Sequence, residues 1–173
     1  MKIENNVGKF KGLCIFTPEL YEDERGWFTE LLREEHLNVK FVQENESYSR
    51  KGVLRGLHYQ KEHPQGKLVR VTQGMAFDVV VDLREDSLTY GKWYGVILSD
   101  MNNRMMYIPE GFAHGFMALS DEVRFNYKCT DYYYPDDQYG YAWDSPALDI
   151  AWPITRDLII SEKDKRLPRF EGR

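Results

Sequence analysis

Residues 53–60 read Val53-Leu54-Arg55-Gly56-Leu57-His58-Tyr59-Gln60, and this run has the composition of a β-strand. It also carries a cation, an imidazole and an amide close together. Charged and titratable side chains need partners inside a sheet, so a strand of this kind usually lines a pocket. A single histidine on a strand more often has a structural role, but Arg55 and Lys67 lie near His58 in the sequence. We therefore build the functional hypothesis around His58.

The surroundings of His58 depend on two features of the chain. Arg55 precedes it by three residues, which places the two side chains on opposite faces of a regular strand unless a bulge at Gly56 re-aims one of them. Lys67 begins the next predicted strand after the short loop 61–66, so the two strands are predicted to be hairpin neighbours. A base, a guanidinium and an ammonium near one another would suit an anionic substrate or a developing oxyanion.

Outward from this run, the chain consists of many short apolar runs separated by turn signals, the pattern of an all-β protein. Residues 76–83 are nearly all apolar but contain Asp78 and Asp82, which predicts a strand buried or paired on both faces. Short helical pieces are expected near 160–165. We expect a jelly-roll β-sandwich or barrel with a few short peripheral helices, formed by residues 1–173 as a single domain with ligand in its mouth. The predicted strands cover residues 13–16, 26–32, 41–47, 53–60, 67–72, 76–83, 93–98, 104–108, 112–119 and 123–129.

Composition excludes several classes of protein. The 173 residues have a net charge of −5, so the chain lacks the basic field of nucleic-acid-binding proteins. Its two cysteines, Cys14 and Cys129, form no motif and predict no disulfide framework. No apolar run approaches the roughly 18 residues of a membrane helix, and residues 1–6 resemble no leader, which predicts a cytoplasmic protein without a membrane partner. Aromatic residues make up 14% of the chain, which favours strands and leaves rings for stacking on flat ligands.

A second histidine, His114, lies in the run Pro109-Glu110-Gly111-Phe112-Ala113-His114-Gly115-Phe116. The Pro-x-Gly-x-x-His piece of this run is similar to the second metal motif of cupins. In metal-binding cupins an earlier strand supplies a His-x-His pair and a glutamate, whereas His58 is followed by tyrosine and glutamine. His63 is predicted to be exposed in a loop. Because zinc or iron needs three protein ligands or more, the sequence predicts cupin geometry with no bound metal and no cofactor.

Two further residues have competing interpretations. Tyr127 opens a tyrosine-rich run and packs in a strand by default, yet its phenol is also a proton donor with a reference pKa of about 10. A histidine on one side of a sugar ring and a tyrosine on the other would form an acid–base pair for inversion. Asp164, at the end of Ser161-Glu162-Lys163-Asp164, belongs either to a capped helix start or to a contact that fixes the tautomer of His58. The sequence alone leaves both interpretations of Asp164 open.

Eight segments of the chain form a combined pattern. They are DERG at 23–26, FVQEN at 41–45, VLRGLHYQ at 53–60, QGKLVR at 65–70, FDVVVD at 77–82, IPEGFAHGF at 108–116, YKCT at 127–130 and SEKD at 161–164. In this order they resemble the dTDP-4-dehydrorhamnose 3,5-epimerase family, the RmlC-type sugar epimerases of the cupin superfamily. Each segment alone is weakly specific, but together they are highly specific and cover nearly the whole chain. The resemblance implies a cupin-type jelly roll.

The resemblance also implies roles for individual residues. His58 would be the general base, oriented by Asp164, and Tyr127 would be the general acid on the opposite face of the sugar. Lys67 and His114 would lie near the 4-keto oxygen. Further contacts to the nucleotide-sugar would come from Arg25, Glu30, Gln43, Asn45, Arg55 and Lys163, with Tyr133 stacked on thymine. The family forms homodimers that exchange N-terminal strands, so Arg25 and Glu30 would reach the partner's site.

The implied reaction is epimerisation of dTDP-4-dehydro-6-deoxy-D-glucose at C3 and C5 to give dTDP-4-dehydro-L-rhamnose, without a metal or redox cofactor. The 4-ketone acidifies the neighbouring C–H bonds, so a base forms an enolate and an acid returns a proton from the other face. An epimerase that acts at C3 or C5 alone shares most of these residues, so this alternative function stays open. A 3,4-ketoisomerase and a non-catalytic sugar-binding cupin fit less well, since base and acid are both present. Glu44 and Gln138 depart from the family pattern, but neither is part of the acid–base pair.

Overall fold

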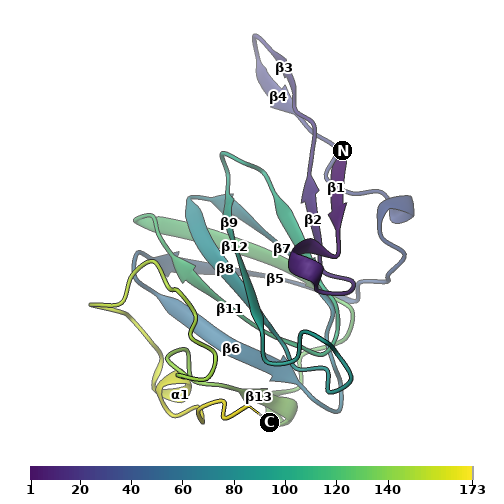
Figure 1. The fold of residues 1–173 in the computed structure, drawn as a ribbon. Coiled ribbons are helices and arrows are strands. Elements are labelled where there is room, and N and C mark those ends of the chain that lie inside the picture. Colours follow the sequence, from purple (N-terminus) through teal and green to yellow (C-terminus); the bar gives the residue numbers. More distant parts are fainter. Residues whose placement is uncertain (173) are drawn as a thin grey trace.

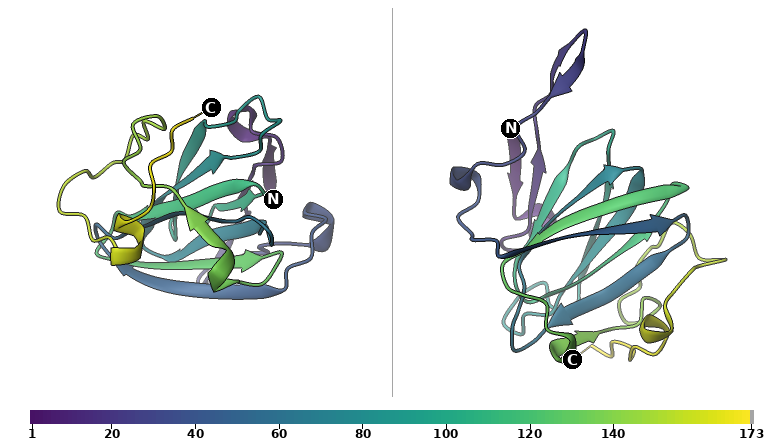
Figure 2. Two further views of the ribbon diagram at one scale, coloured as in Figure 1. Left: turned by 90° about the horizontal axis from the view of Figure 1, so that it is seen from below. Right: turned by 180° about the vertical axis from the view of Figure 1, so that it is seen from behind.

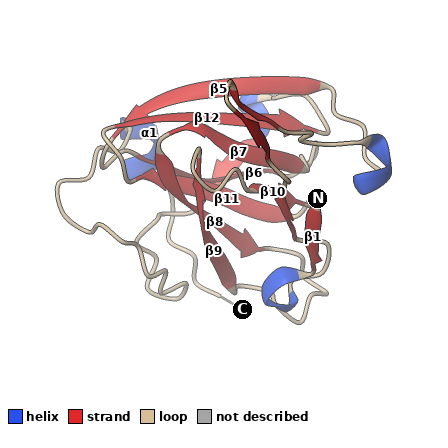
Figure 3. Cartoon of the chain, turned by 90° about the horizontal axis from the view of Figure 1, so that it is seen from above, coloured by secondary structure: helices blue, strands red, loops and turns tan. Residues whose placement is uncertain are grey.

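Two antiparallel sheets form the body of the computed structural model, which describes residues 1–172. The six-stranded sheet runs, in spatial order, β1 (Lys2–Asn5), β2 (Cys14–Thr17), β10 (Met105–Ile108), β7 (Lys67–Gln73), β12 (Glu122–Cys129) and β5 (Gln43–Arg50). The five-stranded sheet runs β13 (Gln138–Gly140), β6 (Leu54–Gln60), β11 (Phe112–Ala118), β8 (Met75–Asp82) and β9 (Trp93–Ser99). Figure 3 shows β5, β12 and β7 as one layer facing β6, β11 and β8. The expected all-β sandwich is confirmed.

Short elements surround this sandwich. A separate hairpin of β3 (Tyr21–Asp23) and β4 (Gly26–Phe28) projects away from both sheets (Figures 1 and 2). The helical pieces are α1 (Glu162–Lys165) and the 3₁₀ turns Val7–Lys9, Glu34–His36 and Pro135–Asp137. Within residues 1–172, no helix has the length and apolar character needed to cross a membrane.

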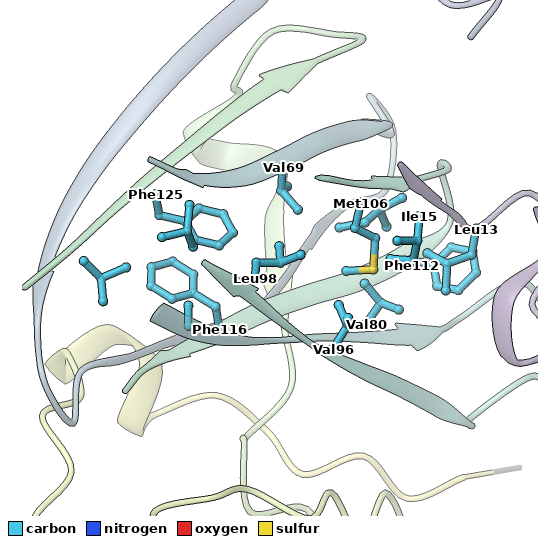
Figure 4. Packing of buried hydrophobic residues seen from close by; sticks show 14 of the residues in the cluster. Leu13, Ile15, Val69, Val80, Val96, Leu98, Met106, Phe112, Phe116 and Phe125 are labelled. Atoms are coloured by element: carbon cyan, nitrogen blue, oxygen red, sulfur yellow. The ribbon is translucent and has the colours of Figure 1, made fainter. Parts of the chain in front are cut away.

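The main core lies between the two sheets, where alternate side chains of facing strands meet. Val69 and Phe125 from the six-stranded sheet pack towards Val80, Leu98 and Phe116 from the five-stranded sheet, and all five are buried (Figure 4). The rings of Phe116 and Phe125 are parallel, with centroids 4.1 Å apart. Removal of such apolar surface from water is the main favourable contribution to folding, about 25 cal/mol per Å². Both rings also line a cavity, so the core ends where the cavity begins.

The C-terminal segment covers the outer face of the five-stranded sheet. Leu57 and Val79 on this face are fully buried beneath Trp152 and Phe170. The segment is also tied to the start of β6, because the backbone N–H of Leu54 donates to the carbonyl of Ile159 at 3.1 Å. These contacts hold α1 beside β6 and thereby place residues far apart in the sequence next to each other (Figure 1).

Most predicted strands are present, with three kinds of difference. The strand expected at residues 26–32 ends at Phe28, and β1, β3 and β13 are short polar strands that the apolar pattern did not reveal. The expectation that the strands of His58 and Lys67 are hairpin neighbours is wrong: β6 and β7 belong to different sheets. The loop 61–66 crosses from one sheet to the other, so it places these two side chains on facing walls.

Asp82 forms a buried polar anchor at the end of β8 and carries a stability prediction. Burial acts to raise the pKa of Asp82, but hydrogen bonds from Arg84, Ser87 and Thr89 outweigh burial and lower it to about 2. A folded-state pKa below the unfolded value of about 3.9 stabilises the fold at higher pH, by about 1.4 kcal/mol per unit. We therefore expect Asp82→Asn to lower the free energy of unfolding by about 2 kcal/mol at pH 7. Urea denaturation measures this difference.

The same anchor predicts how the difference depends on pH. The stabilisation is present above the unfolded pKa and is lost as pH falls through the folded pKa. The gap between the wild type and Asp82→Asn is therefore expected to be full at pH 7 and clearly smaller at pH 3. An equal gap at both pH values would contradict an ionic role for Asp82.

Candidate active site

A cavity of about 650 Å³ lies between the two sheets. One wall comes from β5, β7 and β12 of the six-stranded sheet and the other from β6 and β11 of the five-stranded sheet. Side chains of the C-terminal segment between residues 159 and 164 complete its lining. Ten of the twelve predicted site residues line this cavity: His58, Lys67, Tyr127, Asp164, Gln43, Asn45, Arg55, His114, Tyr133 and Lys163.

His58, on β6, is held by a buried carboxylate. Its Nε2 lies 2.7 Å from Oδ1 of Asp164, whose side chain is only 5% exposed. The second carboxylate oxygen accepts a hydrogen bond of 3.2 Å from the backbone N–H of Gly56. Asp164 also lies in the first turn of α1. Its backbone N–H donates a hydrogen bond of 3.1 Å to the side chain of Ser161, the N-cap residue. Both interpretations of Asp164 therefore hold, since the capped turn delivers the carboxylate to the imidazole.

The Asp164 carboxylate determines how His58 can act. Burial acts to raise the pKa of Asp164, but hydrogen bonds from His58, Gly56 and Ser161 outweigh burial and keep this pKa below its ordinary value. An ionised carboxylate accepts a hydrogen bond from the Nε2–H of His58, so a neutral ring carries its lone pair on Nδ1. Within residues 1–172, no hydrogen bond occupies that nitrogen. This is the arrangement that a general base requires.

A β-bulge brings Arg55 to the same cavity as His58. His58 pairs with His114 and Arg55 pairs with Phe116, so three steps along β6 match two along β11. The extra residue lies at Gly56, whose φ of 107° favours glycine. The backbone of Gly56 also lies close to β11, because a Cβ at this position would be 2.6 Å from the carbonyl oxygen of His114. Arg55 is fixed by a hydrogen bond of 3.0 Å from its Nε to Ser49. The bulge considered from the sequence is therefore present.

Tyr127 lies on β12, in the sheet opposite His58. It pairs with Asn45 on β5 and with Val69 on β7, so these three side chains share one face of the six-stranded sheet. Burial raises the pKa of the Tyr127 phenol, Cys129 adds to this, and Arg55 opposes it. The phenol is therefore protonated at neutral pH and can donate into the cavity from the wall that faces His58.

Lys67 and His114 add two basic groups to the cavity lining. Burial lowers the pKa of Lys67, while Cys129 and Asp78 act in the opposite direction. His114 is only 10% exposed, and its Nε2 lies 3.0 and 2.9 Å from the two carboxylate oxygens of the fully buried Asp78. Two nitrogen donors beside one cavity can bind a carbonyl oxygen and a negative charge that develops on it.

A polar network surrounds another part of the cavity. The Gln43 amide donates to Asn45 at 2.9 Å, and the backbone N–H of Tyr133 donates to Gln43 at 2.8 Å. Gln138 accepts from the Tyr133 hydroxyl at 3.2 Å and also from the Lys163 ammonium. Gln138 therefore lines the cavity together with the predicted contacts. Tyr133 is 46% exposed, which leaves its ring accessible to a flat ligand.

Two predicted site residues lie outside this cavity. Arg25, in the projecting hairpin, pairs with Asp23, and Glu30 pairs with Arg33 at 2.7 Å. Both are surface residues of the N-terminal region, away from the lining. Figure 1 shows how far the hairpin extends from the sheets. That Arg25 and Glu30 reach a partner's site stays a prediction.

Several lining residues were missed because only the strand register reveals them. Ser47 continues the alternation of Gln43 and Asn45 along β5, which is the one signal in the sequence that could have found it. The others that were not identified as site residues are Val53, Leu54, Gln65, Gly115, Phe116, Phe125, Cys129, Ile159, Ile160 and Ser161. Within residues 1–172, no three His, Cys, Asp or Glu side chains are grouped to hold a metal ion. His63 is exposed, as expected.

The chain is similar to proteins of one known family over nearly its whole length. The sequence profile of the dTDP-4-dehydrorhamnose 3,5-epimerase family matches residues 8–172. The curated dTDP-4-dehydrorhamnose 3,5-epimerase of Methanothermobacter thermautotrophicus is 58% identical over 161 residues, which are 89% of this chain and 87% of that protein. The match therefore spans nearly the whole of both chains.

Solved structures show the same fold. The Bacillus anthracis dTDP-4-dehydrorhamnose 3,5-epimerase, crystallised with TDP and pyrophosphate, is 41% identical with a TM-score of 0.92, covering 98% of this chain and 100% of that chain. The Legionella pneumophila enzyme, in complex with dTDP-4-keto-L-rhamnose, is 47% identical with a TM-score of 0.85, covering 92% and 94%. The expected cupin-type jelly roll is thus confirmed, and the chain belongs to the dTDP-4-dehydrorhamnose 3,5-epimerase family.

Proposed function

We propose that this protein is an isomerase that epimerises dTDP-4-dehydro-6-deoxy-D-glucose at C3 and C5 to give dTDP-4-dehydro-L-rhamnose. One observation carries the proposal: His58, held by Asp164, and Tyr127 line the same cavity from opposite sheets. A hexose between them would present one ring face to a base and the other to an acid. The name of the family supports the same reaction.

The proposed mechanism moves one proton at a time. His58 takes the proton from the carbon beside the ketone, and the electron pair of the C–H bond forms a C=C bond while the carbonyl electrons move to oxygen. Lys67 and His114 stabilise the oxyanion by donating hydrogen bonds. Tyr127 then donates its proton to the carbon from the opposite face, which inverts the centre. Each step uses groups of the chain, and no redox cofactor or metal ion is required.

Recognition of the nucleotide is proposed for the more open parts of the cavity. Arg55 and Lys163 offer positive charge for a pyrophosphate, and the exposed ring of Tyr133 offers a stacking surface for thymine. The complexes of the Bacillus anthracis and Legionella pneumophila proteins with TDP and with a dTDP-sugar support a dTDP-linked substrate.

We propose a homodimer in which the β3–β4 hairpin reaches the partner's cavity. Trp27 and Phe28 of this hairpin are 54% and 69% exposed, which is unusual for large apolar side chains. Arg25 and Glu30 are then available to a dTDP-sugar in the second subunit. In this assembly the chain acts as one domain, and we propose that it does so in the cytoplasm.

Proton exchange tests the proposed reaction. The protein is incubated with dTDP-4-dehydro-6-deoxy-D-glucose in deuterated water, and a 4-keto reductase traps the product for NMR. We expect deuterium at both C3 and C5 with both centres inverted. Deuterium and inversion at one carbon alone would reduce the function to that of a single-carbon epimerase, and no exchange at either carbon would contradict the proposal.

A further inference from the structure

Asp78 is a buried carboxylate that takes no part in the proposed proton transfers. It lies on β8 opposite Phe116 of β11 and has no solvent exposure. A carboxylate in such a place is costly unless it is paired, and a buried ion pair is weak evidence for a role in stability. Its two oxygens both contact Nε2 of His114, which lies two residues away along β11. Asp78 therefore contacts a residue of the cavity lining, His114, without lining the cavity itself.

The contact with Asp78 decides which nitrogen of His114 is available to a ligand. Nε2 is directed at the carboxylate, so it carries a proton and donates. Within residues 1–172, no hydrogen bond reaches Nδ1 of His114, and this atom is not fully buried. Because His114 lines the cavity, Nδ1 is open to it. A neutral ring would present a lone pair there, whereas an imidazolium would present an N–H donor.

Asp78 also acts on the second cation of this site. Lys67, on β7, faces the same region, and its charge is supported by Asp78 and Cys129 against the cost of burial. Burial raises the pKa of Asp78, and His114 and Lys67 oppose this. The charged form of each group thus depends on the others. The other titratable groups of this cavity lining are His58 and Arg55 on β6, Tyr127 and Cys129 on β12, and Tyr133, Lys163 and Asp164.

We propose that Asp78 is a positioning residue that holds His114 as an imidazolium, with Nδ1–H directed at the 4-keto oxygen beside the Lys67 ammonium. The proposal rests on the proposed epimerase function. With Lys67 and His114 protonated and Asp78 ionised, the three groups would carry one net positive charge to match the enolate oxygen. His114 keeps its proton throughout: the substrate proton passes to His58, and the returning proton comes from Tyr127. The pairing of Asp78 thus matters most when the oxyanion forms.

Asp78→Asn tests this inference because it keeps the shape and removes the charge. The amide oxygen of the variant side chain can still accept from His114 Nε2, but without the anion the ring is neutral and its Nδ1 lone pair faces the oxyanion. We expect kcat to fall by about 100-fold, as for loss of an oxyanion donor, with KM changed by less than about threefold. The ratio of wild-type to variant kcat should shrink as pH falls from about 8 to about 6, because acid restores the imidazolium. A wild-type kcat, or a ratio independent of pH, would overturn the inference.

Asp82→Asn is the matched control. Asp82 lies four residues further along β8, is equally buried and is outside the cavity lining. We expect it to lose stability while its kcat stays within about twofold of wild type, with no pH-dependent ratio. An equal loss of kcat in both variants would assign the effect of Asp78 to general disruption of the fold.

Two further measurements keep the inference open to refutation if Asp78→Asn does not fold. Nitrogen-15 NMR of the wild type, which has only four histidines, is expected to show both ring nitrogens of His114 protonated with the 4-keto nucleotide-sugar bound. A neutral ring would overturn the inference. Where the variant folds, the double variant Asp78→Asn with His114→Gln should have a kcat only slightly lower than that of His114→Gln alone, because Asp78 acts through His114. Failure of the epimerase proposal is recognised separately, because the wild type itself would then show no exchange.

Discussion

Replacing His58 by alanine is expected to abolish detectable exchange of the C3 and C5 protons in deuterated water, a loss of about 10⁴-fold, at the upper end for a general base. His58 has a buried carboxylate partner at 2.7 Å and a ring nitrogen free for substrate, and it lies in the sheet opposite Tyr127. Without the imidazole, Asp164 stays buried without its partner. It lies behind the position of the ring and is therefore too far from the substrate C–H bond to act as the base in its place. The measurement is NMR of the recovered 4-keto nucleotide-sugar after incubation with the variant.

His36→Ala provides the control for this prediction. His36 lies in an exposed 3₁₀ turn, and its Nδ1 only accepts a hydrogen bond from the Arg33 backbone. Exchange by this variant should match the wild type, and thermal unfolding should show that both variants are folded. Near-normal exchange by His58→Ala would remove His58 as the base, whatever the state of the rest of the cavity.

Most strands, and the grouping of His58, Tyr127 and Asp164 in one cavity, could be predicted from the sequence because their signals are local. Apolar runs bounded by turn residues marked most strands, and residue types with unusual chemistry marked His58, Tyr127 and Asp164. The apolar run 76–83 also predicted a strand buried or paired on both faces, and β8 is buried on both faces over most of its length. What the sequence did not provide was the partner of each carboxylate, because those partners depend on which strands are neighbours.

The relation between β6 and β7 shows why the rest could not be predicted. Six residues, 61–66, connect these strands, and a loop of that length fits both a hairpin and a crossing between sheets. The crossing places Lys67 on the wall opposite His58. Ser47 and Phe125 line the cavity only because β5, β12 and β7 share one register, which no local pattern specifies. The sequence therefore predicted most of the polar residues of the cavity, but not the apolar lining residues or the arrangement of the walls.

Tyr127→Phe is expected to separate proton exchange from inversion. The variant keeps the ring and loses the hydroxyl, so His58 can still remove a proton and form the enolate. Without a donor on the opposite face, the carbon is reprotonated from the side of His58, whose proton exchanges with solvent. We therefore expect deuterium to enter with retained configuration, while formation of the inverted product falls by about 10²- to 10⁴-fold.

The fold and the nucleotide contacts should survive this change. Tyr127 has the half-buried position of a packed ring on β12, and removal of one hydroxyl leaves its apolar contacts with Phe125 in place. Affinity for dTDP, measured by calorimetry, should change little, because Arg55, Tyr133 and Lys163 are untouched. Tyr107→Phe is the matched control, since Tyr107 is a half-buried phenol on β10, outside the cavity lining, whose pKa is also raised by burial. If Tyr127→Phe lost dTDP binding but kept turnover, the phenol would be a ligand contact, and the proton on the second face would have to come from another group.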